Sequence, residues 1–358
     1  MQLLDILEPL AELIACDTRN PPQKTDASGI FDVIRARLPG FRFEHGDAGD
    51  GAQWLLAVRG EPELLFNFHV DTVPDNPDWS RSPFALHQDN GKVYGLGACD
   101  IKGASACMLA AVDHSDAPVA LLFSTDEEAG DSRAVNHFLS LGNRFDQVVV
   151  AEPTMAQAVS VHRGYLSAKL EVRADAGHSS EPRALHDNAI HQTTRWLAKA
   201  LDVAEQMQTV QRFGLSGICL NAGLIEGGIK NNIIAPACSL RFGFRPLPGQ
   251  SPDEVLSQLP SGPGLQLSPG VNLPSLPAAS GDPELKMSQA KALIAELGLP
   301  PGEPVAFWTE ASLFSRAGMT AIVFGPGHIA QAHTADEWVA EEQLLAVAGH
   351  YQRILEAS

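Results

Sequence analysis

Residues 64–71 read LLFNFHVD, and this stretch decides the fold that we expect. Its first five residues are almost all apolar. A run that does not alternate polar with apolar side chains is typical of a strand covered on both faces, as in a parallel sheet flanked by helices. The run leads directly into His69 and Asp71. Because ligand sites in open α/β sheets lie beyond the carboxyl ends of the strands, this pair stands where a site is expected.

The same arrangement recurs along the chain. Apolar runs at 119–123, 148–151 and 321–324 also lead into acidic or histidine side chains. The side chains that follow these runs are Asp126, Glu127 and Glu128, then Glu152, and finally His333. One His-x-Asp pair or one acidic turn is more often structural. Recurrence at all of these strand ends favours one shared site with metal-ligand chemistry.

The glycine-rich loop 95–103, GLGACDIKG, precedes a predicted helix at 103–112. It matches a dinucleotide fingerprint poorly, because Asp100 stands where the third glycine belongs and a phosphate would meet its carboxylate. A carboxylate held by glycines before a helix is better suited to bridge two cations. The chain contains neither a P-loop nor a G-x-S-x-G elbow. Nucleotide chemistry and serine hydrolysis are therefore disfavoured.

Composition excludes several classes of protein. The 358 residues include 25 Lys and Arg against 43 Asp and Glu, a formal net charge of −18. Nucleic acid and an anionic membrane surface are therefore unexpected partners. The N-terminal 18 residues predict an amphipathic helix rather than a secretory signal, because they contain no basic residue before Arg19. The 5 scattered cysteines predict reduced, buried thiols and a cytoplasmic protein.

The middle third has a different pattern. Residues 166–174 and 238–244 alternate apolar with polar side chains, as strands with one buried face do. A helix is expected at 187–207 with an apolar side of Ile190, Trp196, Leu197, Leu201 and Ala204, and a strand at 216–227. Ser251 and Glu254 form a capping-box pattern at a second helix, with room for a closing strand. We therefore expect a small ferredoxin-like α+β domain, 165–274, inserted between two parts of an α/β domain, 1–164 and 275–358.

Motifs in chain order then resemble those of the dinuclear-zinc deacylase and peptidase family, which includes acetylornithine deacetylase, succinyl-diaminopimelate desuccinylase and aminoacylase. They lie at 69–74, 95–103, 126–128, 152–154, 177–180 and 333–337. The blocks at 227–234 and 308–311 are most similar to the acetylornithine deacetylase branch. The chain as a whole resembles the variant of that branch that acts on N-acetyl-L-citrulline. The resemblance implies a zinc-exopeptidase-like catalytic domain and a lid or dimerisation domain.

The resemblance also implies a metal centre with assigned ligands. Asp100 would bridge two divalent ions, Zn²⁺ or Co²⁺. His69 and Glu152 would complete one ion's ligands, and Glu128 and His333 the other's. Imidazole and carboxylate donors suit these metals better than calcium, which prefers oxygen alone.

Further residues receive roles from the same resemblance. Glu127 would be the general base and Asp71 the hydrogen-bond partner of the metal-binding His69. His178 and Asn232 would meet the substrate, with His178 reaching across a dimer, and Arg245 would take the substrate carboxylate. Arg245 could instead serve an ion pair within the sheet. Two departures from the family pattern are the spacing Asn232-Ile-Ile-Ala-Pro and Glu310, which stands where many relatives have Asp and whose role stays open.

We therefore expect a metal-dependent amidohydrolase that releases acetate from N-acetyl-L-citrulline in arginine biosynthesis. N-acetyl-L-ornithine is the alternative substrate, followed by those of a desuccinylase, aminoacylase or dipeptidase. A non-catalytic metal-binding homologue is disfavoured because it would have no use for Glu127. The expected partners are a small N-acetylated amino acid and a second copy of the chain, with no nucleic acid and no membrane.

Overall fold

The computed structural model describes residues 1–142 and 145–357, which form two compact units. The first unit comprises Met1–Ser160, Glu284–Glu303 and the chain from Thr309 onward. The second comprises Val161–Pro283 and Pro304–Trp308. The domain limits 1–164, 165–274 and 275–358 stay predictions beside this division. Among the described helices, none has the length and apolar composition needed to cross a membrane.

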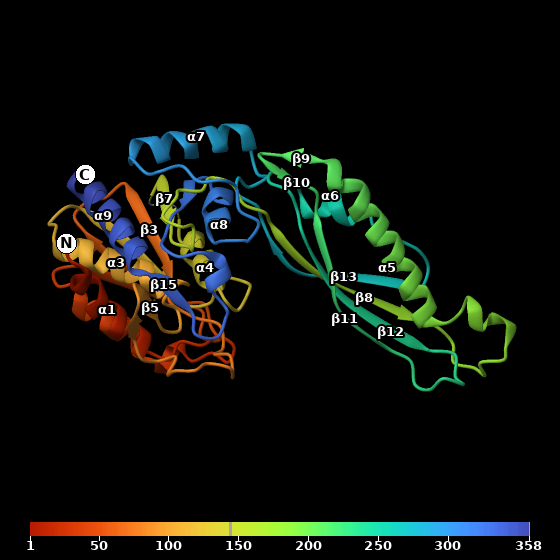
Figure 1. The fold of residues 1–358 in the computed structure, drawn as a ribbon. Helices are drawn as coiled ribbons and strands as arrows, with labels where there is room; N and C mark the ends of the chain where they lie inside the picture. The colour runs from red at the N-terminus through yellow and green to blue at the C-terminus, as the bar shows by residue number, and fades with distance from the viewer. Residues whose placement is uncertain (143–144, 358) are drawn as a thin grey trace. The chain divides into compact units, whose positions relative to one another are not determined.

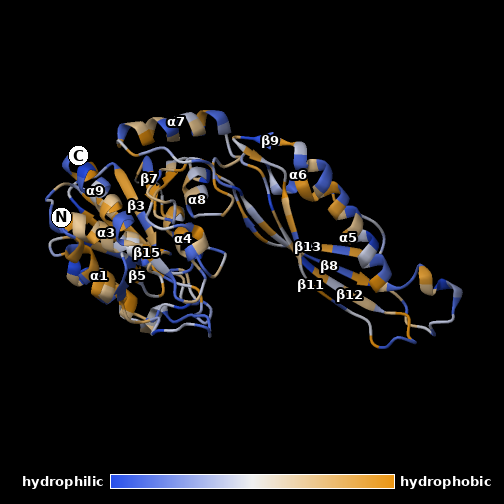
Figure 2. Ribbon diagram, viewed as in Figure 1, coloured by the Kyte–Doolittle hydropathy of each residue, from blue (hydrophilic) through white to orange (hydrophobic). Residues whose placement is uncertain are grey.

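A largely parallel sheet forms the centre of the first unit (Figure 1). Its parallel strands include the apolar runs noted above, and β3 is mostly hydrophobic in Figure 2. Their order is β6 (Val119–Ser124), β3 (Leu64–His69), β7 (Gln147–Val150) and β14 (Thr320–Val323). On the β6 edge the sheet continues antiparallel through β2 (Gln53–Arg59) and β1 (Arg42–Asp47). The predicted α/β class is confirmed.

Helices cover both faces of this sheet, which explains why its parallel strands are mostly apolar. On one face α1 (Leu3–Ala15), α3 (Lys102–Asp113) and α9 (Glu341–Ala357) pack together. Tyr351 of α9 packs edge-on against Phe66 of β3, with 5.6 Å between ring centroids. The other face carries α4 (Arg133–Ser140) and α8 (Ala311–Arg316). The first unit also contains α2 (Ile30–Arg37) and most of α7 (Pro283–Glu296).

A short three-stranded sheet in the first unit joins two segments that are far apart in the chain. Its strands are β4 (His87–Asp89), β5 (Lys92–Tyr94) and β15 (Trp338–Ala340). Tyr94 pairs with Trp338. The glycine-rich loop starts directly after β5, and the segment 333–337 ends directly before β15. This pairing therefore brings the two predicted motifs together.

The second unit has the predicted β-α-β-β-α-β order. Its antiparallel sheet runs β11 (Cys219–Gly227), β12 (Ala237–Arg245), β8 (Tyr165–Arg173) and β13 (Leu265–Leu273). The helices are α5 (Ala189–Gln206) and α6 (Pro252–Leu256), and a minor hairpin pairs β9 (Gln211–Arg212) with β10 (Leu215–Ser216). Trp196 of α5 packs on Phe242 of β12, so the helix covers the apolar face of the sheet.

Three local predictions about this unit were wrong. Leu201 is 43% exposed, because the buried side of α5 follows Trp196, Ala200 and Ala204, spaced four residues apart. Cys219 is exposed on the edge strand β11, although the other four free cysteines are buried. The Ser251 side chain does cap α6, but it accepts from the N–H of Asp253 rather than forming the expected box with Glu254.

Candidate metal centre

The carboxyl ends of β3, β6 and β7 lie side by side, because these strands are parallel neighbours. β3 ends at His69, and Ser124 at the end of β6 is its register partner. Glu127 and Glu128 follow β6, and Glu152 follows β7. The sheet therefore gathers side chains separated by as many as 83 positions in the chain, from His69 to Glu152, at one edge.

Two groups of possible metal ligands form here, and Asp100 belongs to both. In the first group, ligand atoms of His69, Asp100 and Glu152 lie within 4.8 Å of one another, and all three residues are buried. The second group contains Asp100, Glu128 and His333 within the same limit. Asp100 Oδ1 lies 3.0 Å from His69 Nε2, whereas its Oδ2 lies 3.4 Å from His333 Nε2. The two oxygens of one carboxylate thus face the two groups.

Electrostatics at this edge are dominated by crowded acids. Burial, followed by the Glu152 carboxylate, raises the pKa of Glu127 well above its usual value. Burial, followed by the Asp100 carboxylate, likewise raises the pKa of Glu152 well above its usual value. Hydrogen bonds to Asp100 and Glu128 raise the pKa of His333 to about 11. Such a cluster favours bound positive charge, whether protons or a metal cation.

The buried Asp71 carboxylate lies beside the His69 imidazole, and it also contacts the neighbouring strand end. His69 Nδ1 lies 3.1 Å from the backbone oxygen of Asp71 and 3.6 Å from its carboxylate. The carboxylate also accepts from the backbone N–H groups of Glu127, at 3.3 Å, and Glu128, at 3.1 Å. Asp71 therefore orients the acidic turn after β6 as well as the imidazole.

Glu337 is a residue of this centre for which the sequence predicted no role. Its buried carboxylate accepts three backbone N–H bonds, from Gly97 at 3.0 Å, Cys99 at 2.8 Å and Asp100 at 3.0 Å. These bonds fix the turn that presents Asp100. The only signal in the sequence is the position of Glu337 in the 333–337 motif, which says nothing about its partners.

Glu310 lies beneath the strand ends and is also buried. Its Oε2 accepts from Asn67 Nδ2 at 2.7 Å and from Ser124 Oγ at 2.9 Å. Asn67 is two residues before His69 on β3, and Ser124 ends β6. Glu310 therefore holds together the two strand ends that carry the centre, which is a structural role for the residue that sequence left open.

Asp126, the first acid of the 126–128 cluster, does not join either group. Its carboxylate accepts from the backbone N–H groups of Arg133, at 2.6 Å, and Ala134, at 3.2 Å, in the first turn of α4. Burial, with Glu310 next, raises its pKa to about 7. Asp126 thus serves the helix rather than the metal groups.

Three further predicted site residues belong to the second unit. The backbone of His178 forms a bridge with Ile233, and Ser179 donates to the carbonyl of Asn232, so His178 and Asn232 lie on neighbouring loops. His178 is exposed, and its Nδ1 lies 2.7 Å from Ser180 Oγ. Arg245 is the last residue of β12, where its guanidinium lies 5.2 Å from the centre of the Tyr165 ring.

His178 and Arg245 lie at opposite ends of the inserted sheet. The loop of Asn232 leads into the start of β12 at Ala237, whereas Arg245 ends that strand. Nine strand residues separate the two ends by about 26 Å at ~3.3 Å per residue. Within one chain the structure therefore does not bring His178 and Asn232 together with Arg245.

Comparisons with known proteins agree with this architecture. A family model described as Peptidase family M20/M25/M40 matches residues 65–357. An N-acetyl-L-citrulline deacetylase of Xanthomonas campestris pv. campestris is 47% identical, covering 99% of both chains. An acetylornithine deacetylase of Myxococcus xanthus is 32% identical over 94% of this chain and 93% of its own. A tripeptidase from Staphylococcus aureus has the same fold, with a TM-score of 0.74 at 18% identity, covering 100% of this chain and 98% of the other.

Proposed function

The chain belongs to peptidase family M20/M25/M40, and from that premise we propose that it hydrolyses N-acetyl-L-citrulline to acetate and citrulline. The observation that carries the substrate assignment is the 47% identity over 99% of both chains to an N-acetyl-L-citrulline deacetylase. Deacetylation of N-acetyl-L-ornithine is the second candidate, supported by the 32% identical relative. Either reaction would serve arginine biosynthesis. The free thiols of the protein suit a reducing cytoplasm.

The residues present fit two divalent metal ions. Each group contains one imidazole and two carboxylates, a donor set that suits Zn²⁺ or Co²⁺. Glu152 Oε1 is buried and has no hydrogen-bond partner among the described residues. His69 and Glu152 would hold one ion and Glu128 and His333 the other, with Asp100 shared between them. Bound ions would lower the pKa of a coordinated water and polarise the acetyl carbonyl.

Glu127 would act as the general base and then as the general acid of the reaction. Its carboxylate takes a proton from the attacking water, whose oxygen bonds to the acetyl carbon. The C–N bond then breaks, and the same proton goes to the leaving amine, so that acetate and the free amino acid are released. Burial raises the pKa of Glu127, which favours a group that accepts and then returns a proton. Asp71 orients the backbone of this turn through its bonds to Glu127 and Glu128.

Substrate recognition would use the second unit of two copies of the chain. Arg245 would bind the α-carboxylate through its planar guanidinium. The start of β12, next to the loops of His178 and Asn232, lies about 26 Å from Arg245, too far for both ends to meet the same small molecule. His178 and Asn232 would reach the substrate held by the partner's copy of the chain, where an imidazole N–H stabilises the developing oxyanion.

The edge strand β11 supports such a homodimer. It lies at the edge of the inserted sheet, so one of its sides is unpaired. Leu224 and Ile225 are 42% and 49% exposed there, and a long apolar edge of this kind favours pairing with another strand. We expect two copies to join through β11.

The test is release of acetate by the protein loaded with Zn²⁺ or Co²⁺. Acetylcitrulline and acetylornithine are assayed for acetate, and succinyl-diaminopimelate for succinate. We expect acetate, with acetylcitrulline as the better substrate. Failure to release acetate from either acetylated substrate would contradict the proposal, and release of succinate alone would favour a desuccinylase.

A further inference from the structure

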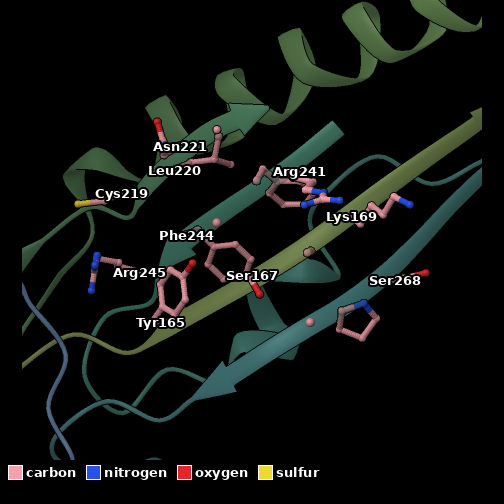
Figure 3. A pocket seen from close by; sticks show the side chains of 16 residues that line it. Tyr165, Ser167, Lys169, Cys219, Leu220, Asn221, Arg241, Phe244, Arg245 and Ser268 are labelled. Carbon is pink, nitrogen blue, oxygen red and sulfur yellow. The ribbon is translucent and has the colours of Figure 1, made fainter. Parts of the chain in front are cut away.

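The open face of the inserted sheet, opposite α5, contains a groove of about 680 Å³ (Figure 3). Its polar lining includes Tyr165, Ser167 and Lys169 of β8, Asn221 of β11, and Arg241 and Arg245 of β12. We call this the sheet groove. Its volume lies in the range of about 300–1,000 Å³ that is typical of sites for small ligands.

The charged side chains that line the sheet groove are all positive: Lys169, Arg241 and Arg245. Lys169 has a carboxylate partner outside the lining, Glu171 at 2.8 Å. Neither arginine has an ion pair with a carboxylate in the described part of the chain. The groove therefore carries positive charge that the protein itself does not neutralise.

The arrangement of these cations is unfavourable for the sheet alone. Arg241 and Lys169 are direct register partners on neighbouring antiparallel strands. Like charges at directly opposed positions destabilise a sheet, because their Cβ atoms are only about 5 Å apart. Figure 3 shows the Arg241 and Lys169 side chains on adjacent strands over this face. A ligand that brings negative charge would relieve this repulsion, and a cationic one would increase it.

The sheet groove is connected to substrate recognition through Arg245. Arg241 and Arg245 lie on the same face of β12, four residues and about 13 Å apart. If Arg245 holds the α-carboxylate and the amino-acid side chain extends along the groove, the end of that side chain comes closer to Arg241 than the screening length of about 10 Å at 0.1 M salt.

Resting on the proposed function, we propose that the sheet groove selects N-acylated amino acids with an uncharged side chain and rejects those with a cationic one. Arg241 is the specificity-determining residue. Acetylcitrulline has a carboxylate and a neutral ureido group, a net charge of −1, whereas the ammonium group of acetylornithine brings its net charge to −1 + 1 = 0. The positive groove attracts the first molecule and repels the ammonium end of the second.

The test compares three substrates that differ at the end of the side chain. Acetylcitrulline ends in a ureido group, acetylornithine in an ammonium group, and acetylnorvaline in a methyl group. If groove charge governs selection, kcat/KM for acetylornithine is lowest, below even that for acetylnorvaline, and the gap narrows as salt is raised. If kcat/KM for acetylornithine equals or exceeds that for acetylnorvaline, the proposal is overturned.

Variants then assign the effect to Arg241. Arg241→Glu is expected to raise the acetylornithine/acetylnorvaline ratio of kcat/KM by at least about fivefold, and Arg241→Gln by less, because charge interactions scale with the charge present. Lys199→Glu, on the exposed side of α5, makes the same change in net charge away from the groove and is expected to leave the ratio unchanged. An unchanged ratio in both Arg241 variants, or an equal shift in Lys199→Glu, contradicts the assignment.

Calorimetric binding to the metal-loaded Glu127→Ala variant separates this proposal from the proposed function. If no substrate is hydrolysed by the wild-type protein but acetylnorvaline still binds more tightly than acetylornithine, the groove proposal stands and the proposed function fails. If acetate is released while both molecules bind equally, the proposed function stands and the groove proposal fails.

Discussion

Glu337 accepts a hydrogen bond from the backbone N–H of Asp100 at 3.0 Å, although 237 positions separate the two residues. The same carboxylate accepts the N–H groups of Gly97 and Cys99. A side chain that contacts neither candidate ligand atom of Asp100 thus decides where both of those oxygens lie. The position of the Asp100 carboxylate therefore depends on the pairing of β5 with β15, since that pairing brings Glu337 to the glycine-rich loop.

Glu337→Gln is therefore expected to weaken metal binding about 10–100-fold, as replacements of groups behind metal ligands commonly do. The amide leaves at least one of the three N–H groups without an acceptor, at a cost of about 1–3 kcal/mol in unfolding free energy. Metal titration and thermal unfolding measure the two effects. Glu341→Gln, which alters a half-buried acid that accepts a bond from Gln88, is the control. Equal metal affinity in both variants would contradict the role of Glu337.

Glu127 and Glu128 are adjacent but are expected to respond differently to removal. Glu127→Ala should abolish turnover and retain about two metal ions per chain, because it removes a base. Glu128→Ala should lose metal, since its Oε1 lies 3.1 Å from His333 in the second ligand group. Metal analysis beside the acetate assay checks both. Loss of metal from Glu127→Ala would mean that base and ligand have been exchanged.

His162 is expected to make stability depend on pH in the acidic range. Its side chain is fully buried, and this burial lowers its pKa from 6.5 to about 4. The bond to the Arg163 carbonyl raises the pKa of His162, and the nearby charge of Arg245 lowers it further. The unfolded chain takes up this proton at higher pH than the folded one, so the stability present above about 6.5 is lost as pH falls toward 4.

Denaturant unfolding of wild type and His162→Gln from pH 7 to 4 measures this contribution. The free energy of unfolding should fall more steeply with decreasing pH in the wild type. His186→Gln, which alters an exposed imidazole in the second unit, is the control. Identical slopes in all three proteins would show that His162 does not contribute.

Ile225→Lys should disrupt the dimer, because a charge on the exposed edge strand β11 opposes strand pairing. Sedimentation at micromolar concentration should detect monomer in this variant and dimer in the wild type. The variant should also lose acetate release if His178 acts on the partner's substrate. Leu345→Lys, at a 40% exposed position on α9, is the control. A wild-type monomer would rule out the shared site.

Much of this protein could be predicted because its signals are local. The strands β3, β6, β7 and β14 are apolar runs, and the alternation of β8 and β12 is visible within nine residues each. Polar side chains directly after parallel strands converge because the strands share a direction. His69, Glu128 and Glu152 could therefore be nominated from sequence, and the structure gathers them with Asp100 and His333.

Other features had no local signal. Asp71 was expected beside His69, but its bonds to the backbone N–H groups of Glu127 and Glu128 could not be predicted, since those groups come from the neighbouring strand end. Glu310 was left without a role because its partners, Asn67 and Ser124, lie 243 and 186 positions away. The exposure of Leu201 depends on which side of α5 meets the sheet.

By itself, the sequence determined the classes of chemistry available to this protein: strands that end in carboxylates and imidazoles, a glycine loop carrying Asp100, and an alternating inserted domain. Only the tertiary structure decided which of these groups meet. Periodicity and strand-end composition are properties of a few consecutive residues. Hydrogen-bond partners such as Glu337 and Asp100, and the common positive face shared by Lys169, Arg241 and Arg245, are set by strand pairing between distant segments.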